Sequence, residues 1–224
     1  MALTSPENFN SDYLREQVME TYDHVAREPH ADYHFHRGPE YASKYLGYDY
    51  SELISLPEIS TARFAGVGNP IDIGEIEPGM VVLDHACGAG MDLLLAAKRV
   101  GPTGYAIGVD MTPRMRECAS QGAKEADLED IVDIREGFFE NLPVEDETVD
   151  IVISNGVVNL SPDKEQVFKE IYRVLKPGGR LFMADVVVQR ELTLDARSNP
   201  DIWAACIGGA PVSYTHLTLP TKTE

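Results

Sequence analysis

The chain has 224 residues, enough for one ordinary domain with a real core, and its 43% hydrophobic and 25% charged residues are normal globular usage. Its 19 basic and 37 acidic side chains give a formal charge of −18, which disfavours nucleic acid as a substrate and anionic lipid as a docking surface, because like charges repel. Three widely spaced cysteines, together with the lack of a signal-peptide pattern or a membrane-length apolar run, predict a cytoplasmic protein that does not enter a membrane.

The N-terminal segment 1–75 is predicted to form one helix and a loop-rich cap. A helical spacing of apolar side chains predicts an amphipathic helix over residues 11–27. Residues 28–75 are polar with Pro and Gly breaks, so we expect loops there. Within them, His34 and His36 alternate as in an extended segment, which would suit a metal pair or a general base, although local hydrogen bonding is the commoner role.

Strands and helices are predicted to alternate through residues 76–190. Ser161-Pro162 is expected to cap the last helix of this region, and Pro177-Gly178-Gly179 to stop it. The alternation predicts an α/β fold with a Rossmann-like, doubly wound, mostly parallel sheet that is covered on both faces. The predicted strands are residues 81–83, 105–109, 131–134, 149–154 and 180–188.

The last part of the chain is less regular. Residues 191–211 are predicted to contain a short helix that starts at Asn199-Pro200, carries Trp203 and Cys206, and flanks the substrate site. Residues 212–224 are rich in Thr and Pro and resemble translated adapter sequence. We therefore expect a non-native tail there, a natural chain that continues differently, and a sheet that lacks its C-terminal strands.

The residues best suited to ligand binding follow the first predicted strand. Asp84 ends that strand, and Gly88 and Gly90 would let a ligand approach the backbone at the start of the next helix. A nicotinamide dinucleotide would require Gly where Leu93 stands, and the acid after the strand suits a cationic amino group instead. Asp110 ends the second strand, where a carboxylate can bind ribose hydroxyls.

Four segments resemble, in order, the motifs of class I S-adenosylmethionine (SAM)-dependent methyltransferases: VVLDHACGAGMD, AIGVDMT, EGFFENLPVEDETVDIVISN and EIYRVLKPGGRL. Within that family the chain is most similar to arsenite methyltransferases, through VGPTGYAIGVDMTPRM, VVISNGVVNLSPDK and WAACIGGA. The resemblance implies the class I methyltransferase fold, SAM as cofactor and a small-molecule methyl acceptor. It also implies a cofactor pocket lined by Asp84, Ala86, Cys87, Gly88, Gly90, Asp110, Met111, Gly137, Phe138, Phe139 and Asn155.

The chain departs from this family at the arsenic site. Arsenite methyltransferases carry cysteines where Val67 and Gly156 stand, and only Cys206 matches a family cysteine. Trivalent arsenic is held best by several thiolates, so we expect poor arsenite methylation. By resemblance, Asn155 would lie beside the transferred methyl group, and Cys206 would serve the acceptor side.

Other positions are interpreted with the same resemblance. Ala86 replaces a usual Gly, and Phe138 replaces an acid that binds adenine, so we expect backbone N–H groups to recognise adenine. Cys87 and Cys118 are interpreted as packing residues, and no metal site is predicted. The segment Tyr22–Ala26 resembles the lid helix that covers SAM in related enzymes, or is an ordinary packed helix.

Three functions stay open on the sequence alone. The first is methylation of an unassigned small molecule, and the second is arsenite methylation through Cys206 with small thiols such as glutathione. The third is SAM binding without catalysis. The N/D-P-P-Y motif of amino-group methyltransferases is absent, since Gly156 follows Asn155, and the oligomeric state is not predicted.

Overall fold

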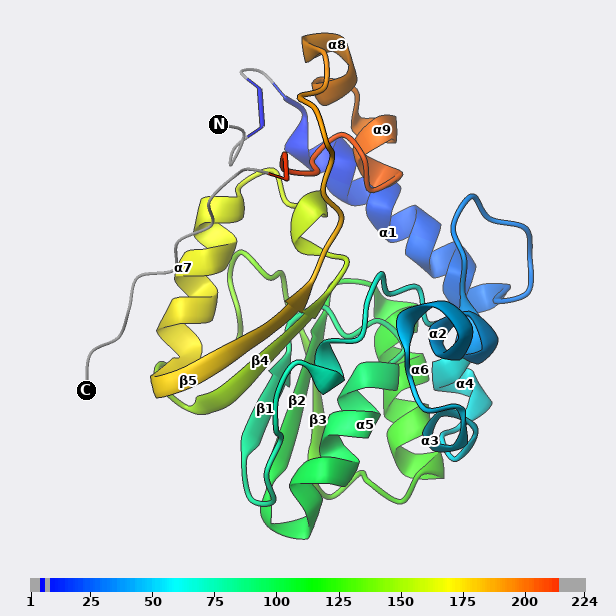
Figure 1. Cartoon of the computed structure of the whole chain (residues 1–224), viewed down its shortest axis with the longest axis vertical. Helices are drawn as coiled ribbons and strands as arrows, with labels where there is room; N and C mark the ends of the chain where they lie inside the picture. Colours follow the sequence, from blue (N-terminus) through cyan, green and yellow to red (C-terminus); the bar gives the residue numbers. More distant parts are fainter. Residues whose placement is uncertain (1–4, 7–8, 214–224) are drawn as a thin grey trace.

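A computed structural model describes residues 5–6 and 9–213, and a five-stranded parallel sheet forms its centre (Figure 1). The strands are arranged in the order β3-β2-β1-β4-β5. Their order reverses between β1 and β4, which confirms the predicted doubly wound, Rossmann-like sheet and places a ligand crevice at the carboxyl ends of these two strands. The strands are β1 (Val81–Asp84), β2 (Tyr105–Asp110), β3 (Val132–Glu136), β4 (Val149–Asn155) and β5 (Leu175–Ala184).

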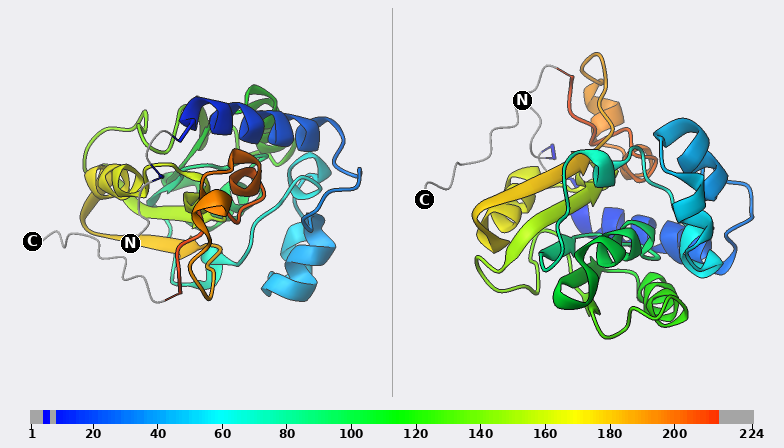
Figure 2. Two further views of the ribbon diagram at one scale, coloured as in Figure 1. Left: turned by 90° about the horizontal axis from the view of Figure 1, so that it is seen from above. Right: turned by 60° about the horizontal axis from the view of Figure 1, so that its bottom comes forward.

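Helices cover both faces of the sheet, as the alternating pattern predicts (Figures 1 and 2). Helices α5 (Met91–Val100) and α6 (Pro113–Glu125) lie on one face, and α7 (Lys164–Val174) lies on the other. Successive strand residues point to opposite faces, so Val82 packs in the cluster that includes α5, whereas Leu83 packs in the cluster that includes α7. In the described part of the chain, no helix combines the length and the apolar character that a bilayer crossing requires.

Two predicted boundaries around α7 are wrong. Its N-cap is Asp163, whose carboxylate accepts the N–H of Gln166 at 3.0 Å, and not Ser161. The Pro-Gly-Gly sequence lies inside β5 and does not separate helix from strand, because Leu175 already pairs with Val149 before a shift in register. The strand then ends at Ala184, four residues earlier than predicted.

The N-terminal helix is confirmed, and the loop-rich segment after it also contains short helices that the sequence did not predict. Helix α1 spans Ser11–Arg27, and four short helical segments follow it. Each is too short to show a periodic pattern, but their ends carry capping signals. Asp49 accepts the N–H groups of Ser51 and Glu52 at the start of α3, and Gly47 ends α2 in a left-handed conformation. The segments are α2 (Gly38–Leu46), α3 (Tyr50–Ile54), α4 (Glu58–Thr61) and η1 (Pro70–Asp72).

The C-terminal helix α9 (Pro200–Ala204) begins at the predicted Asn199 cap and lies beside α1 (Figures 1 and 2). The rings of Phe9 and Trp203 lie 4.7 Å apart, and Trp203 is buried among apolar side chains of α1. The remaining short elements are η2 (Gly101–Thr103), η3 (Val158–Leu160) and α8 (Leu194–Arg197). Most of the predicted tail 212–224 lies outside the described residues, and the division at 75, 190 and 211 stays a prediction.

Candidate functional site

A pocket opens at the carboxyl ends of β1, β2 and β4, with α1 along its rim. It encloses about 1060 Å³ when the open solvent at its mouth is included. The structure brings into its lining every residue that the sequence assigns to cofactor binding. These residues are Asp84, Ala86, Cys87, Gly88, Gly90, Asp110, Met111, Gly137, Phe138, Phe139 and Asn155.

The two glycines of the turn after β1 serve different purposes. Gly88 has φ +52°, and a Cβ built on it would meet no atom within 4 Å, so a ligand can lie directly over this backbone. Gly90 has φ +89°, and a Cβ there would lie 3.2 Å from the Cβ of Ala119. Gly90 therefore permits α5 to pack closely on α6, and only Gly88 offers open space to a ligand.

Two carboxylates flank this turn, as expected from their places at the ends of β1 and β2. Asp110 accepts the N–H of Gly88 at 2.9 Å and that of Thr112 at 2.8 Å, which ties the two turns together. Burial raises the pKa of Asp110, and burial together with the nearby charge of Asp92 raises the pKa of Asp84 well above its usual range. Buried carboxylates that lie close together favour a ligand with cationic and hydroxyl groups.

Asn155 lines the pocket, but its amide is engaged by the protein. Its Oδ1 accepts the N–H groups of Val67 at 2.8 Å and Gly68 at 3.2 Å. Its Nδ2 donates to the carbonyl of Gly68 at 3.0 Å, to Asp92 at 2.9 Å and to the hydroxyl of Tyr48 at 3.2 Å. With these contacts, Asn155 fixes the loop at residues 67–68 against the end of β4.

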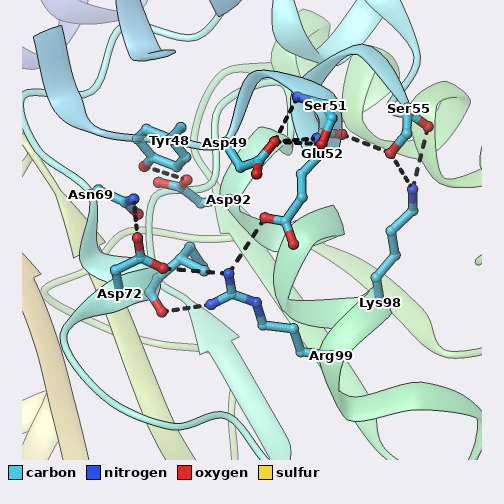
Figure 3. Close-up of polar contacts among 11 residues, drawn as sticks. Tyr48, Asp49, Ser51, Glu52, Ser55, Asn69, Asp72, Asp92, Lys98 and Arg99 are labelled. Atoms are coloured by element: carbon cyan, nitrogen blue, oxygen red, sulfur yellow. Dashed lines mark hydrogen bonds and ion pairs between the residues drawn. The ribbon is translucent and has the colours of Figure 1, made fainter. Parts of the chain in front are cut away.

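Asp92, in the first turn of α5, is the buried centre of this arrangement. Its carboxylate accepts the hydroxyl of Tyr48 at 2.7 Å, as Figure 3 shows. Burial raises the pKa of Asp92 to about 6, and the hydrogen bonds from Asn155 and Tyr48 limit the rise. Neither Asp92 nor Tyr48 is among the site residues that the sequence predicts. An acid two residues after the glycine turn was the available signal, whereas nothing in the sequence connects Tyr48 to the site.

The other end of α5 is also bound to the cap. Arg99 donates to the carbonyl of Ile71 at 2.6 Å and pairs with Asp72 at 3.4 Å and Glu52 at 3.5 Å (Figure 3). Lys98 reaches the hydroxyl of Ser55 at 2.8 Å. These contacts hold the short helices after α1 on the same helix that carries Asp92.

Val67 and Gly156, the two positions where the resemblance to arsenite methyltransferases implies cysteines, adjoin each other. A Cβ built on Gly156 would lie 3.2 Å from Cγ1 of Val67. Gly156 has φ +73°, a conformation that side-chain-bearing residues adopt only with strain. A valine therefore lies beside a glycine where two thiols would otherwise meet, next in sequence to the lining residues Gly66 and Asn155.

Cys206 lies outside the pocket lining. It follows the end of α9 with φ +61°, and it packs in the apolar cluster that includes Trp203. Burial, with a contribution from the charge of Asp185, raises the pKa of Cys206 to about 11, so the thiol is protonated at neutral pH. Cys87 and Cys118 are also buried free thiols, each in an apolar cluster.

The histidines that sequence analysis considered as bases do not line this pocket. His34 is exposed and its ring meets Phe35 edge-on. His36 is also exposed, and its ring is tilted against that of Tyr41, with the centroids 5.3 Å apart. Tyr22 of α1 does line the pocket, as expected for a helix that covers a ligand.

Comparison with known proteins places these features in a family context. The family model described as "Methyltransferase domain" matches residues 76–220. An arsenite methyltransferase of Halobacterium salinarum is 45% identical over 168 residues, which are 75% of this chain and 42% of that protein. A demethylmenaquinone methyltransferase of Lactobacillus johnsonii is 39% identical over 108 residues, covering 48% of this chain and 44% of that protein.

Among solved structures, the chain is similar to CrArsM, an arsenic(III) SAM methyltransferase from Chlamydomonas reinhardtii. The two are 42% identical with a TM-score of 0.60, over 67% of this chain and 52% of that one. The chain spans about half the length of the curated relatives it matches.

Proposed function

Because the chain belongs to the class I SAM-dependent methyltransferases and to their arsenite-methyltransferase-like group, we propose that its pocket binds SAM and that the protein methylates a small molecule. The observation that supports this proposal is that Asp84, Gly88 and Asp110 line one pocket, with Asp110 hydrogen-bonded to the backbone of Gly88. Family and fold both imply SAM as the cofactor.

The donor groups present fit SAM. Asp84 would hold the ammonium group of the methionine moiety, and Asp110 would accept hydrogen bonds from the ribose hydroxyls. The open space over Gly88 accommodates a ligand at the backbone. Phe138 is 43% exposed in the pocket wall and offers an apolar surface to adenine.

SAM supplies an activated methyl group on a sulfonium, so the protein's task is to position the acceptor and exclude water. Helix α1 and η3 provide an apolar wall through Leu14, Val18 and Leu160, which restricts water. Asn155 acts as a positioning residue, because its amide is engaged by the loop at 67–68.

Within the described residues, the pocket wall offers no basic histidine, and Asp92, the lining carboxylate whose pKa rises to about 6, already accepts hydrogen bonds from Tyr48 and Asn155. The only histidine in the lining is His85, whose Nε2 lies 2.9 Å from the hydroxyl of Ser154 and whose pKa burial lowers to about 4. A weakly basic imidazole removes a proton from a hydroxyl inefficiently at neutral pH. The pocket therefore favours an acceptor that is a soft nucleophile, a carbanion or an already ionised group.

Arsenite methylation is a second candidate, supported by the relatives that carry this name. It would depend on Cys206 with small thiols such as glutathione. The valine and glycine at the other two positions favour a less thiophilic acceptor, because trivalent arsenic is held best by several thiolates.

The test is methyl transfer from radiolabelled SAM with a panel of arsenite, quinol precursors and small phenols. We expect label on an organic acceptor and little on arsenite. Calorimetric SAM binding without transfer to any acceptor in a broad panel would instead identify a SAM-binding protein without catalysis. Failure to bind SAM at all would refute the proposed cofactor.

A further inference from the structure

The pocket wall has more acidic than basic side chains, and its two arginines differ in the ion pairs that they form. Four carboxylates line it, and the guanidinium groups in the lining are those of Arg15 and Arg63. Arg15 lies 3.5 Å from Asp12 and 3.8 Å from Glu140, so acidic neighbours already offset its charge. Arg63 forms no ion pair with any residue of the described segments.

Arg63 is nevertheless held in place. Its Nε donates to the carbonyl of Ala26 at 2.8 Å, and its Nη1 donates to the carbonyl of Ile59 at 3.0 Å. Its Nη2 makes no hydrogen bond with the described residues. The side chain is therefore oriented by two neutral acceptors, and one face of a positively charged fork stays available in the wall of the pocket.

The place of Arg63 is beside the glycine turn. Ala26, whose carbonyl accepts from Arg63, packs in the same apolar cluster as Ala89, the residue between the two glycines. Burial raises the pKa of Cys118 in that cluster, and the positive charge of Arg63 opposes the rise. Both observations place the guanidinium near the turn that follows Asp84.

The other arginine lies at the opposite end of the pocket. Arg15 lies over the ring of Phe138, 5.6 Å from its centroid. At 1.5 Å per residue, Arg15 and Ala26 are separated by about 16 Å along α1. The two arginines therefore lie in different parts of the pocket, separated along this helix, and would contact different parts of an extended ligand.

We propose that Arg63 binds the carboxylate of the methionine moiety of SAM; this inference rests on the proposed function. An amino-acid end that presents its ammonium to Asp84 carries its carboxylate close by. The negative charges of Asp84 and Asp92 would repel that carboxylate without a cation. A guanidinium fork matches carboxylate geometry and remains charged at neutral pH.

The test compares SAM with decarboxylated SAM, which keeps the adenosine, the sulfonium and the amine but has no carboxylate. Calorimetry on the wild-type chain should show tighter binding of SAM. Arg63→Met should weaken SAM binding about 10- to 100-fold, the range of a charge-assisted hydrogen bond, and change the affinity for decarboxylated SAM less than about threefold. Arg63→Lys should recover part of the SAM affinity because it restores the charge.

Arg114→Met is the matched control. Arg114 pairs with Asp23 at 3.1 Å and so, like Arg63, joins another segment to α1, in this case α6, but it does not line the pocket. Its loss should leave both affinities unchanged. If Arg63→Met does not fold, Arg63→Gln replaces it, because Gln can still donate to a backbone carbonyl but carries no charge.

Equal weakening of both ligands by the loss of Arg63 would assign it a purely structural role and overturn the inference. Equal binding of the two ligands by the wild-type chain would also overturn it, while the proposed function would stand. A wild-type chain that binds neither ligand would refute the proposed function and this inference with it.

Discussion

The side of the pocket proposed to hold the cofactor comes from the ends of consecutive strands, whereas the side around Asn155, the proposed acceptor side, is assembled from segments far apart in the chain. Asp84 and Gly88 follow β1, and Asp110 ends β2, so the local strand–turn–helix sequence places them together. On the acceptor side, the amide of Asn155 joins β4 to the loop at 67–68 and to Asp92. A change of acceptor can therefore occur by substitution in that loop while the cofactor turn is kept.

The largest expected effect is on arsenite turnover, and it tests whether residues 67 and 156 determine the acceptor. We expect poor arsenite turnover by the unmodified chain and a rise of about a hundredfold or more in the double variant Val67→Cys, Gly156→Cys, because thiolates orient the metalloid and orientation can supply about 7–11 kcal/mol of a barrier. The backbone at residue 156 will resist the change, with a strain of roughly 1–2 kcal/mol.

The measurement is arsenite methylation at saturating SAM, with the stability of each variant determined in parallel. Val67→Cys alone is the control that avoids the strained position, and we expect a smaller gain from it. Robust arsenite methylation by the unmodified chain, undiminished by Cys206→Ser, would show that the missing thiols do not matter.

The next effect tests the assembly of the acceptor side. Asn155→Ala removes five hydrogen bonds and leaves the N–H groups of Val67 and Gly68 unpaired. We expect the free energy of unfolding to fall by about 3 kcal/mol or more, because each buried unpaired group costs roughly 1–3 kcal/mol. Urea titration measures it.

Asn69→Ala is the matched control for that variant, since Asn69 lies in the next turn of the same segment and donates only to Asp72, at 2.9 Å. Its loss should cost less than about 1 kcal/mol. Similar costs for the two substitutions would mean that Asn155 does not hold the acceptor side together.

The turn after β1 carries a buried histidine, His85, whose contribution to stability depends on pH. Burial lowers the pKa of His85 from 6.5 to about 4, so between these values the unfolded chain binds a proton that the folded chain does not. Stability from this residue is therefore lost as the pH falls from about 6.5 to about 4, by roughly 3 kcal/mol in all. The stability of wild type relative to His85→Leu should fall along this range.

The contribution of Asp92 to stability should change with pH in the opposite direction. Its pKa is raised from 3.8 to about 6, so the folded chain binds the extra proton, and this contribution to stability is lost as the pH rises through about 6. Wild type should therefore gain stability relative to Asp92→Asn on acidification. The same pH slope for both variants would contradict the two assignments.

The smallest expected effect tests the cofactor side itself. Asp110→Ala should weaken SAM binding about 10- to 100-fold, or roughly 1.4–2.8 kcal/mol, in a folded protein, and NADH should not bind. Titration calorimetry gives both results. Asp133→Ala is the control, because Asp133 lies on β3, pairs with Arg135 at 2.8 Å and does not line the pocket.

The fold and the cofactor residues could be predicted because their signals are local. Apolar runs and the turn after Asp84 indicate where strands end, and parallel strand ends meet at one edge of a sheet. The short helices of the N-terminal cap could not be predicted, because α3 and α4 are too short to show a helical spacing of apolar residues. The Asp92–Tyr48 contact was missed because only tertiary packing brings these residues together across 44 positions.

The contact between Phe9 and Trp203 joins the two ends of the described chain, with consequences for the order of folding. Helix α1 can bury Leu14 and Val18 against Trp203 only after α9 has left the ribosome. The sheet, whose neighbouring strands lie closer in sequence, can form earlier, since closing long loops slows contact formation. We therefore expect the ligand pocket to be completed late in biosynthesis, when the first helix closes over a sheet that is already built.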